Sequence, residues 1–352
     1  MRKLTFAKAV NEALHIAMKR DPKVLCYGLG ADDPKRIFGT TDQLQESFGQ
    51  ERVFDMPTSE NAMTGVGVGV ALAGYRPVMM HQRLDFFLLA MDQLVNSAAK
   101  WHYMFGGQSS VPMVIRLVMG RGWGQGPTHS QNLQSWFAHI PGLKVVTPTT
   151  AYDAKGLLLE SIFDDNPVVF LEHRWLHNSE SEVPEEDYRI PIGSARVARK
   201  GCDVTLVGMS YMVVEALRAA DVLAEQGISC EVIDLRTVRP IDWPTVFASV
   251  RKTSKLIALD SSMPTCSVAS EIIARVSMEH FDALTHAPVR IANPDNPEPT
   301  SFGLTKHFHP NAAHIVQSVA RMLSAEVNMQ ALEKQQAECL HDVPGDWFKG
   351  PF

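Results

Sequence analysis

The sequence predicts an α/β protein with two domains, each built on a parallel sheet that helices cover. Short apolar segments alternate with amphipathic helical segments over residues 1–190, and the same alternation resumes after residue 203. Strands that are apolar throughout are typical of parallel sheets buried on both faces. The 352 residues are enough for two domains with separate cores.

The first domain, residues 1–190, opens with a predicted helix over residues 5–20. Thr5 is its N-cap, and apolar residues recur at every fourth position from Phe6 to Met18. Further strands are predicted at 24–27, 53–55, 77–80, 112–118, 144–148 and 167–172, and further helices at 60–73, 86–103 and 151–163.

Residues 178–203 are acidic at their start and lack a periodic pattern, which predicts a solvated connection. The second, smaller domain is predicted at 200–324, with a helix over 213–226 that Gly227 closes. Its strands are expected at 203–208, 229–235, 255–259 and 289–291. Residues 325–352 form a polar C-terminal extension.

Composition excludes several classes of function. The net charge of −6 gives no electrostatic support for nucleic-acid binding. The five cysteines are odd in number and widely spaced, so we expect neither a disulfide framework nor a zinc site. The N-terminal residues lack an apolar signal core, and no apolar run reaches the roughly 18 residues of a membrane span. We therefore expect a cytoplasmic protein without membrane contact.

Glu60 is the most informative residue of the chain. Between Met56 and Tyr75 it is the only charged side chain, and it opens a helix of small residues. Burial of an ionised carboxylate in such surroundings is costly, so a carboxyl group here is suited to share a proton with a partner. The alternative is that Glu60 only stabilises a helix N-terminus, where an acid contributes about 0.3–1 kcal/mol.

Residues 55–60, Asp-Met-Pro-Thr-Ser-Glu, precede a glycine-laced helix and then Gly-Tyr-Arg-Pro. This segment resembles the β subunit of thiamine-diphosphate-dependent 2-oxoacid dehydrogenases, in the wider transketolase-like family. The resemblance runs through residues 4–323 in the family's order, with further motifs at 90–100, 126–131, 141–146, 153–157, 165–169 and 232–237. It implies a pyrimidine-binding domain at 1–190 and a transketolase C-terminal-type domain at 200–324.

The resemblance also implies roles for individual residues. Glu60 would hold a proton on the pyrimidine ring of thiamine diphosphate, next to Thr58. Gln82 and Phe86 would contact the same ring, with Phe86 stacking on it. His129, after a glycine-dense loop, would move substrate or acyl-transfer protons. Considered alone, Phe86 could equally be a core residue, and His129 a loop histidine bonded to backbone.

A third group of residues, Ser161, Asp164 and Asn166, resembles a potassium site of some β subunits. Hard oxygen ligands at the end of a helix can hold such a cation. A polar helix terminus before a proline explains the same residues equally well.

The diphosphate half of the expected site is absent from the sequence. The family holds Mg²⁺ and the diphosphate with Gly-Asp-Gly and a later Asn, and this chain contains no Gly-Asp-Gly. The resemblance therefore implies an α subunit that carries the Mg²⁺ site, in a heterotetramer of two α and two β subunits. A lipoyl-bearing acyltransferase is a further expected partner, although residues 263–271 and the extension depart from the family pattern used for docking.

Three functions remain open at this point. The first is decarboxylation of a 2-oxoacid of the pyruvate or branched-chain type, with transfer of the acyl unit. The second is a split transketolase-like enzyme that transfers a two-carbon or acyl unit to a sugar or aldehyde. In that enzyme Arg83, Arg121 and Arg174 would bind phosphate or carboxylate groups, unless they form ordinary ion pairs. The third is a scaffold subunit without catalysis.

Overall fold

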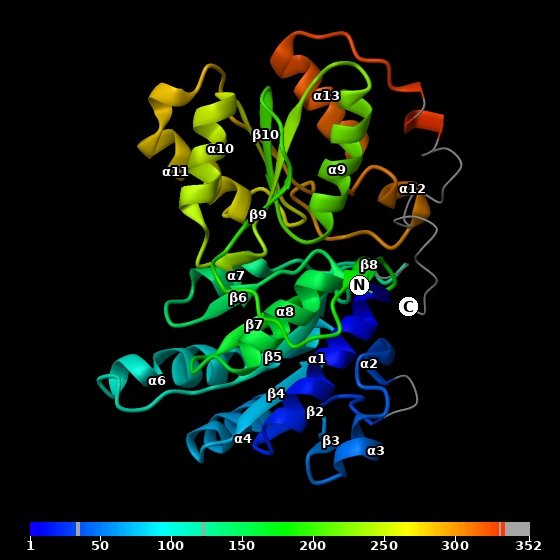
Figure 1. Cartoon of the computed structure of the whole chain (residues 1–352). Coiled ribbons are helices and arrows are strands. Elements are labelled where there is room, and N and C mark those ends of the chain that lie inside the picture. The colour runs from blue at the N-terminus through cyan, green and yellow to red at the C-terminus, as the bar shows by residue number, and fades with distance from the viewer. Residues whose placement is uncertain (33–35, 122–123, 331, 335–352) are drawn as a thin grey trace.

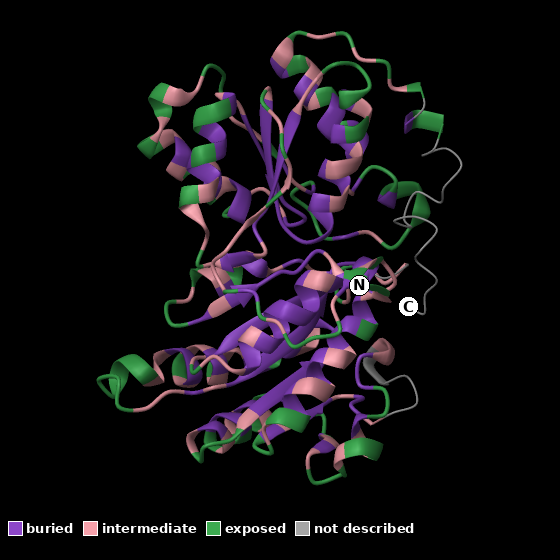
Figure 2. Cartoon of the chain, in the orientation of Figure 1, coloured by how far each residue is buried: buried purple, intermediate pink, exposed green. Residues whose placement is uncertain are grey.

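The computed structural model describes residues 1–32, 36–121, 124–330 and 332–334. Two sheets lie one above the other in Figure 1, each flanked by helices. The central strands of the two sheets are buried, whereas the helices alternate buried and exposed faces (Figure 2). The expected α/β class is therefore confirmed.

The larger sheet has seven strands in the order β12-β6-β7-β5-β4-β2-β3. All neighbouring pairs are parallel except β12 with β6. The strands are β2 (Val24–Gly28), β3 (Val53–Asp55), β4 (Arg76–His81), β5 (Val114–Met119), β6 (Lys144–Val146), β7 (Val168–His173) and β12 (Thr237–Arg239).

Helices cover both faces of this sheet. One face packs against α1 (Phe6–Arg20) and α8 (Ala151–Ile162), and α2 (Arg36–Gly39) and α3 (Leu44–Phe48) lie at its edge. The other face packs against α4 (Glu60–Leu72), α7 (Gln134–His139) and one long helical stretch. That stretch consists of α5 (Leu84–Phe87), η1 (Leu88–Ala90), the π-helical turn η2 (Gln93–Ala98) and α6 (Ala99–Met104).

The smaller sheet has five strands in the order β14-β13-β10-β11-β9, of which only β9 is antiparallel to its neighbour. Its strands are β9 (Arg196–Arg199), β10 (Val204–Gly208), β11 (Cys230–Asp234), β13 (Leu256–Leu259) and β14 (Val289–Ile291). Its helices are α9 (Tyr211–Ala224), α10 (Trp243–Thr253), α11 (Val268–Glu279), α12 (Phe302–Thr305) and α13 (Ala312–Leu323), with the short turn η4 (Phe281–Ala283). The short turn η3 (Arg174–Leu176) follows β7 of the larger sheet.

An apolar core continues from one sheet to the other. Met79 and Ile115 of the larger sheet belong to the same buried cluster as Val207 and Ile233 of the smaller sheet. The two sheets are therefore held together by buried apolar contacts as well as by the chain connection.

Two strands arise where the sequence predicts a solvated connection. β8 (Glu180–Val183) pairs antiparallel with β1 (Arg2–Thr5), and β9 forms the edge of the smaller sheet. The expectation of an irregular connection over 178–203 is wrong at these strands, because long-range pairing partners supply their backbone hydrogen bonds. β12 was also missed; it follows the second region's β11 but pairs with β6 of the larger sheet.

Several helices, among them α1, α4 and α8, begin and end close to the residues that the sequence predicts. Thr5 caps α1, since its hydroxyl accepts the backbone N–H of Lys8 at 3.2 Å. Thr150 and Asp153 form a reciprocal capping box at the start of α8. Among the helices of the described residues, none combines the length and the hydropathy that crossing a membrane requires. The extension predicted at 325–352 lies mostly outside the described residues.

Candidate active site

The predicted cofactor residues follow neighbouring strands of the larger sheet. β2 lies between β3 and β4, so Gly28 is paired with both Asp55 and Met80. The chain after β3 leads into α4 at Glu60, and the chain after β4 continues to Gln82. Because parallel strands end at the same edge of a sheet, both segments lie at its carboxyl edge, where α/β proteins bind ligands.

Glu60 is buried at the first turn of α4, with 7% of its surface exposed. Its carboxylate has no hydrogen bond or ion pair with any residue that the structure describes, although its backbone carbonyl accepts the Thr64 hydroxyl at 2.8 Å. Thr64 also contacts Met79 Sδ at 3.4 Å, which fixes this turn against β4. A carboxylate in a largely enclosed residue that no described residue bonds is suited to bind a ligand.

Thr58 and Gln82 are less enclosed than Glu60. Thr58 is exposed on the turn before α4, and Gln82 is half-buried directly after β4. Neither side chain forms a hydrogen bond within the described part of the chain, so both retain donors and acceptors for a ligand.

Phe86 and His129 lie in contact. Their ring centroids are 5.3 Å apart, and the rings meet edge to face at 89°. His129 Nδ1 lies 2.9 Å from the Thr128 hydroxyl. The structure therefore brings together one predicted cofactor residue and one predicted catalytic residue from segments 43 positions apart.

Two polar contacts fix the segment that carries His129 to the segment that carries Phe86. Asp85 Oδ1 accepts the side-chain amide of Gln131 at 2.8 Å and its backbone N–H at 3.4 Å. Arg83 donates to the Gly120 carbonyl at 3.1 Å and also to the side-chain oxygen of Gln125. The His129 segment is thus fixed on both sides of the histidine.

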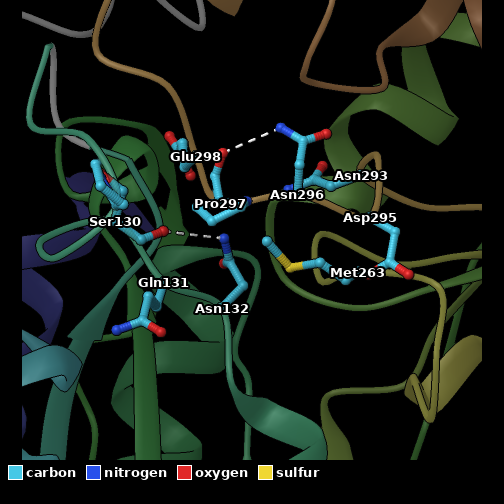
Figure 3. Close-up of a pocket in the computed structure, with 10 residues that line it drawn as sticks. Ser130, Gln131, Asn132, Met263, Asn293, Asp295, Asn296, Pro297 and Glu298 are labelled. Carbon is cyan, nitrogen blue, oxygen red and sulfur yellow. Dashed lines mark hydrogen bonds between the residues drawn. The ribbon is translucent and has the colours of Figure 1, made fainter.

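A cavity of about 290 Å³ adjoins this segment on the side of the second domain. Figure 3 shows Ser130, Gln131 and Asn132 on one wall and Met263 and residues 293–298 on the other. Asn132 donates to the Ser130 carbonyl at 3.3 Å, so part of the polar lining is satisfied internally. The cavity lies between the two domains and is lined by Pro127 and Ser130, which lie on either side of His129 in the sequence.

Three buried histidines form a further group in the first domain. Burial lowers the pKa of His81 to about 4, and its ring packs edge to face on Phe87 at 5.1 Å. Burial, with repulsion from neighbouring cationic groups, lowers the pKa of His173 to about 3. Burial also lowers the pKa of His177 to about 4, against the opposing effect of Glu172. These side chains are neutral at pH 7, because burial disfavours the charged form of the ring.

The three arginines considered for phosphate recognition are buried and bonded within the chain. Arg83 contacts Gly120 and Gln125, as described above, and burial lowers its pKa to about 10. Arg121 Nη1 donates to His309 Nε2 at 3.0 Å, and the Arg174 guanidinium lies 4.2 Å from the centre of the Phe38 ring. Each of the three guanidinium groups thus has a partner within the chain, and none is a surface arginine.

The segment proposed for potassium is held by cationic side chains. Arg76 donates to the backbone carbonyls of Ile162 and Asp164 at 3.3 and 2.9 Å. Lys144 pairs with the Asp164 carboxylate, and Ser161 donates to the Leu157 carbonyl at 2.7 Å. The backbone N–H of Asn166 donates to Asp164 Oδ1 at 2.8 Å. These contacts favour the polar helix terminus, while the potassium site stays a prediction.

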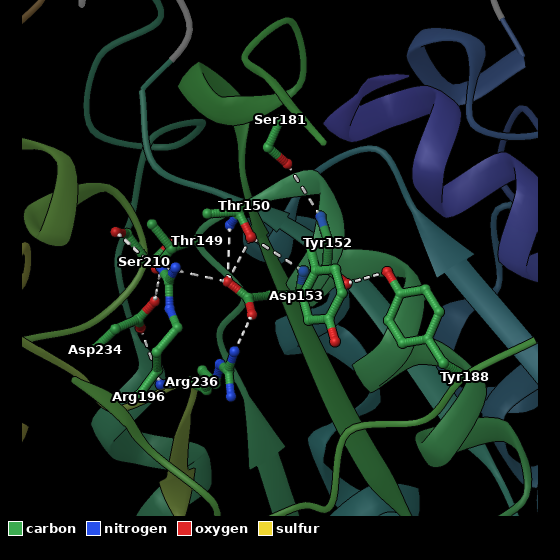
Figure 4. Close-up of polar contacts among 10 residues, drawn as sticks. All are labelled: Thr149, Thr150, Tyr152, Asp153, Ser181, Tyr188, Arg196, Ser210, Asp234 and Arg236. Carbon is green, nitrogen blue, oxygen red and sulfur yellow. Dashed lines mark hydrogen bonds and ion pairs between the residues drawn. The ribbon is translucent and has the colours of Figure 1, made fainter. Parts of the chain in front are cut away.

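A second polar cluster joins the domains and was missed because its members are far apart in sequence. Asp153 Oδ1 lies 2.7 Å from Arg236, and Arg196 donates to Asp234 at 3.1 Å (Figure 4). Burial, together with the neighbouring Asp153, raises the pKa of Asp234 to about 6. This cluster links the start of α8 to β9 and to the residues after β11.

Comparison with known proteins agrees with this arrangement. Residues 2–179 match the family model of the transketolase pyrimidine-binding domain, and residues 193–315 match that of the transketolase C-terminal domain. A solved structure titled as a split-gene transketolase in an inactive beta4 tetramer shares the fold, with a TM-score of 0.73 and 23% sequence identity. That match covers 91% of this chain and 98% of the other.

Two curated relatives cover most of the chain. The acetoin:2,6-dichlorophenolindophenol oxidoreductase subunit beta of Cupriavidus necator is 42% identical over 332 residues, or 92% of this chain and 98% of that protein. The pyruvate dehydrogenase E1 component subunit beta of Rhizobium meliloti is 42% identical over 320 residues, or 91% of this chain and 70% of that protein.

These relatives are β subunits, and the two matched domains occur in the order that the sequence motifs predict. The dehydrogenase interpretation is therefore favoured over the split transketolase. The buried Glu60, the matched domains and the extended identity together assign the chain to the transketolase-like family, as a β subunit of the thiamine-diphosphate-dependent 2-oxoacid dehydrogenases.

Proposed function

We propose that this chain supplies the pyrimidine half of an active site shared with an α subunit. The enzyme so formed decarboxylates a 2-oxoacid and passes the acyl unit to an acceptor. The observation that carries the proposal is Glu60, a buried carboxylate for which the described residues provide no partner. In a protein of this family, the natural partner of that carboxylate is the cofactor.

The side chains at the carboxyl edge fit thiamine diphosphate. Glu60 would hold a proton at a pyrimidine ring nitrogen, Gln82 would bond the ring's polar edge, and Phe86 would supply an aromatic surface. Thr58 lies on the turn before Glu60 and would line the same site. When bound, the cofactor supplies the nucleophilic carbon that no amino-acid side chain provides.

His129 would act on substrate or acceptor. It is half-buried, its ring contacts Phe86, and one ring nitrogen faces the Thr128 hydroxyl. Histidine is the side chain that most often acts as a general acid or base in catalysis. We assign it to the step after the substrate has been cleaved, when the acyl unit leaves for its acceptor.

The α subunit would bring the Mg²⁺ and diphosphate half of the site, since this chain lacks Gly-Asp-Gly. A surface for such a partner lies beside Glu60. Val66 of α4 is 52% exposed, Leu89 of η1 is 69% exposed, and a Cβ added at Gly69 would meet no other atom. Gly67, in contrast, packs inside the chain against Tyr27 and Met113. We expect two α and two β chains in the assembly.

The proposed substrate rests on the names of the relatives. One relative is named for acetoin and another for pyruvate, and we propose pyruvate or a branched-chain 2-oxoacid as the substrate here. A lipoyl group on an acyltransferase is the proposed acceptor, and the cytoplasm the proposed compartment. Potassium at Ser161, Asp164 and Asn166 remains part of the proposal, against competition from Arg76 and Lys144.

The test is reconstitution with the α chain that contains Gly-Asp-Gly. The complex should release carbon dioxide from a 2-oxoacid and reduce an electron acceptor. Pyruvate, a branched-chain 2-oxoacid and acetoin are compared in parallel, first with a lipoyl acceptor and then with an aldehyde acceptor. Turnover with the aldehyde and none with the lipoyl acceptor would contradict the proposed acyl transfer.

A further inference from the structure

We propose that the second domain positions the His129 loop, through two contacts at Arg121 and Gly126. This inference rests on the proposed role of His129 in acyl transfer. Glu298, Thr300 and His309 of the second domain are then positioning residues for the transfer step.

The first contact holds Arg121, directly after the end of β5. Arg121 Nη1 donates to His309 Nε2 at 3.0 Å, and Arg121 Nε lies 3.7 Å from Glu298 Oε1. The same Glu298 oxygen lies 3.3 Å from His309 Nε2. The arginine and glutamate side chains are 1% and 3% exposed, so water screens this cluster little.

The second contact lies at Gly126, three residues before His129. A Cβ added at Gly126 would approach Thr300 Oγ1 to 2.2 Å, so the glycine backbone packs directly on the second domain. Gly126 has φ +68°, a conformation that favours glycine. The backbone N–H of His129 bonds the Gly126 carbonyl at 3.4 Å, which links this contact to the histidine itself.

The first domain supplies further contacts to the same segment. Arg83 and Asp85, which flank Leu84 before Phe86, bond it at Gly120 and Gln131. A histidine on a loop has no helix or strand to fix its direction. A displacement of about 1 Å can cost on the order of 100-fold in rate, so both sets of contacts matter to proton transfer at His129.

The sharpest test uses two glycines of the same loop. Gly124 has φ +65° and a Cβ added there would meet no atom of the described residues, whereas Gly126 has φ +68° and would meet Thr300. Gly124→Ala therefore introduces backbone strain alone, and Gly126→Ala introduces strain plus a clash with the second domain. In the reconstituted complex we expect Gly126→Ala to slow acyl transfer about tenfold more than Gly124→Ala does.

Removal of the Thr300 hydroxyl should rescue the defect. With Thr300→Ala the nearest Thr300 atoms would be 3.5 Å or more from the added Cβ, an ordinary contact. The double variant Gly126→Ala with Thr300→Ala should then transfer acyl groups about as fast as Gly124→Ala. Deuterium exchange at the reactive carbon of the cofactor should stay within about twofold throughout, because that step depends on Glu60.

The Arg121 contact is tested by two substitutions of His309, of which one is conservative and the other is not. Gln at position 309 retains an acceptor near the position of Nε2, so His309→Gln should preserve transfer while His309→Ala slows it severalfold. Glu298→Gln should also slow transfer without affecting exchange. Glu279→Gln is the matched control, since Glu279 pairs with Arg275 on the exposed face of α11. Thermal melting verifies that each variant is folded.

His129→Ala, measured in parallel, distinguishes a failure of the positioning role from a failure of the proposed role of His129. If it slows transfer while the Gly126, His309 and Glu298 variants match their controls, the positioning role is wrong and the proposed function stands. If His129→Ala leaves transfer unchanged, the proposed role of His129 fails first. Equal loss of exchange and transfer in the Gly126 and Glu298 variants would also overturn the inference, because it would mean a general structural defect.

Discussion

The surroundings of Glu60 and of His129 differ in how far this chain completes them. Glu60 is buried yet has no side-chain partner among the described residues. The His129 segment is held by Arg83 and Asp85 and also packs on the second domain.

The difference shows which part of the chemistry the β subunit performs with its own contacts. A buried group without a partner is expensive and persists where a ligand supplies the missing bond. A loop that other parts of the same chain hold in place needs no ligand to keep its conformation. We infer that Glu60 acquires its partner when the cofactor and the α subunit bind, whereas the His129 segment already has its contacts within this chain.

The largest expected effect comes from Glu60→Gln. The amide cannot exchange a proton with the pyrimidine ring as a carboxyl group does, so deuterium exchange at the reactive carbon should fall by at least ~100-fold. Assembly with the α subunit should be unchanged. Exchange is measured by rapid quench and nuclear magnetic resonance, and assembly by sedimentation.

Glu271 provides the matched control for Glu60. It also lies in the first turn of a helix, α11, but it is exposed. Glu271→Gln should cost at most ~1 kcal/mol in the free energy of unfolding and leave exchange at the native rate. If both variants lose only that much stability and neither loses exchange, Glu60 is merely a helix-capping acid.

His129→Ala should have the next largest effect, confined to the later step. Loss of general acid–base catalysis predicts a fall of roughly 100-fold in acyl transfer, with deuterium exchange nearly unchanged. Single-turnover transfer to a lipoyl acceptor measures the effect. His102→Ala, at an exposed histidine of α6, is the control. Equal loss of both steps would refute the division of roles between Glu60 and His129.

A smaller effect is expected from Asp85→Ala. The change removes the acceptor for Gln131, so the His129 segment loses one of its braces and transfer should slow roughly tenfold. Asp92→Ala is the control, because among the described residues Asp92 bonds Asn96 and Gln93 of the same helical stretch and nothing near His129. Identical transfer rates in the two variants would show that the brace is dispensable.

The smallest effect concerns pH and stability. The lowered pKa of His173 means that the folded state keeps this histidine neutral while the unfolded chain protonates it near pH 6.5. The unfolded state then binds more protons, so the free energy of unfolding falls as pH falls from about 6.5 toward 4. The slope is at most about 1.4 kcal/mol per pH unit for this residue.

Urea denaturation at a series of pH values measures that slope. His173→Gln should flatten it, whereas substitution of the exposed His102 should not. A slope that is the same in wild type and His173→Gln would mean that His173 is protonated in the folded protein. The neighbouring His177 and His81 should add to the same trend, since burial lowers their pKa values as well.

Much of the fold could be predicted because apolar segments mark its strands. The predicted segments at 24–27 and 289–291 correspond to β2 and β14, and Thr5 and Thr150 cap helices as local chemistry demands. β8, β9 and β12 could not be found in this way. Their residues are polar or few, and their pairing partners lie far away in the sequence.

The site residues also divide into those that a local sequence pattern reveals and those that only long-range packing brings together. Glu60 was found because its isolation among uncharged residues is a local signal, and its lack of a partner in the structure agrees with a ligand-binding role. The contacts that hold the His129 segment depend on long-range packing. Arg121 meets His309 across 188 positions, and no periodicity or motif indicates such a pair. Roles for Thr58 and Gln82 remain predictions.

The central claim is that Glu60 meets a cofactor whose diphosphate end is bound by another polypeptide. Titration calorimetry of thiamine diphosphate with Mg²⁺ tests it most directly, first with the purified chain and then with the α subunit present. The chain alone should bind at least ~100-fold more weakly than the complex, and Glu60→Gln should weaken binding only in the complex. Tight binding by the isolated chain would contradict the claim.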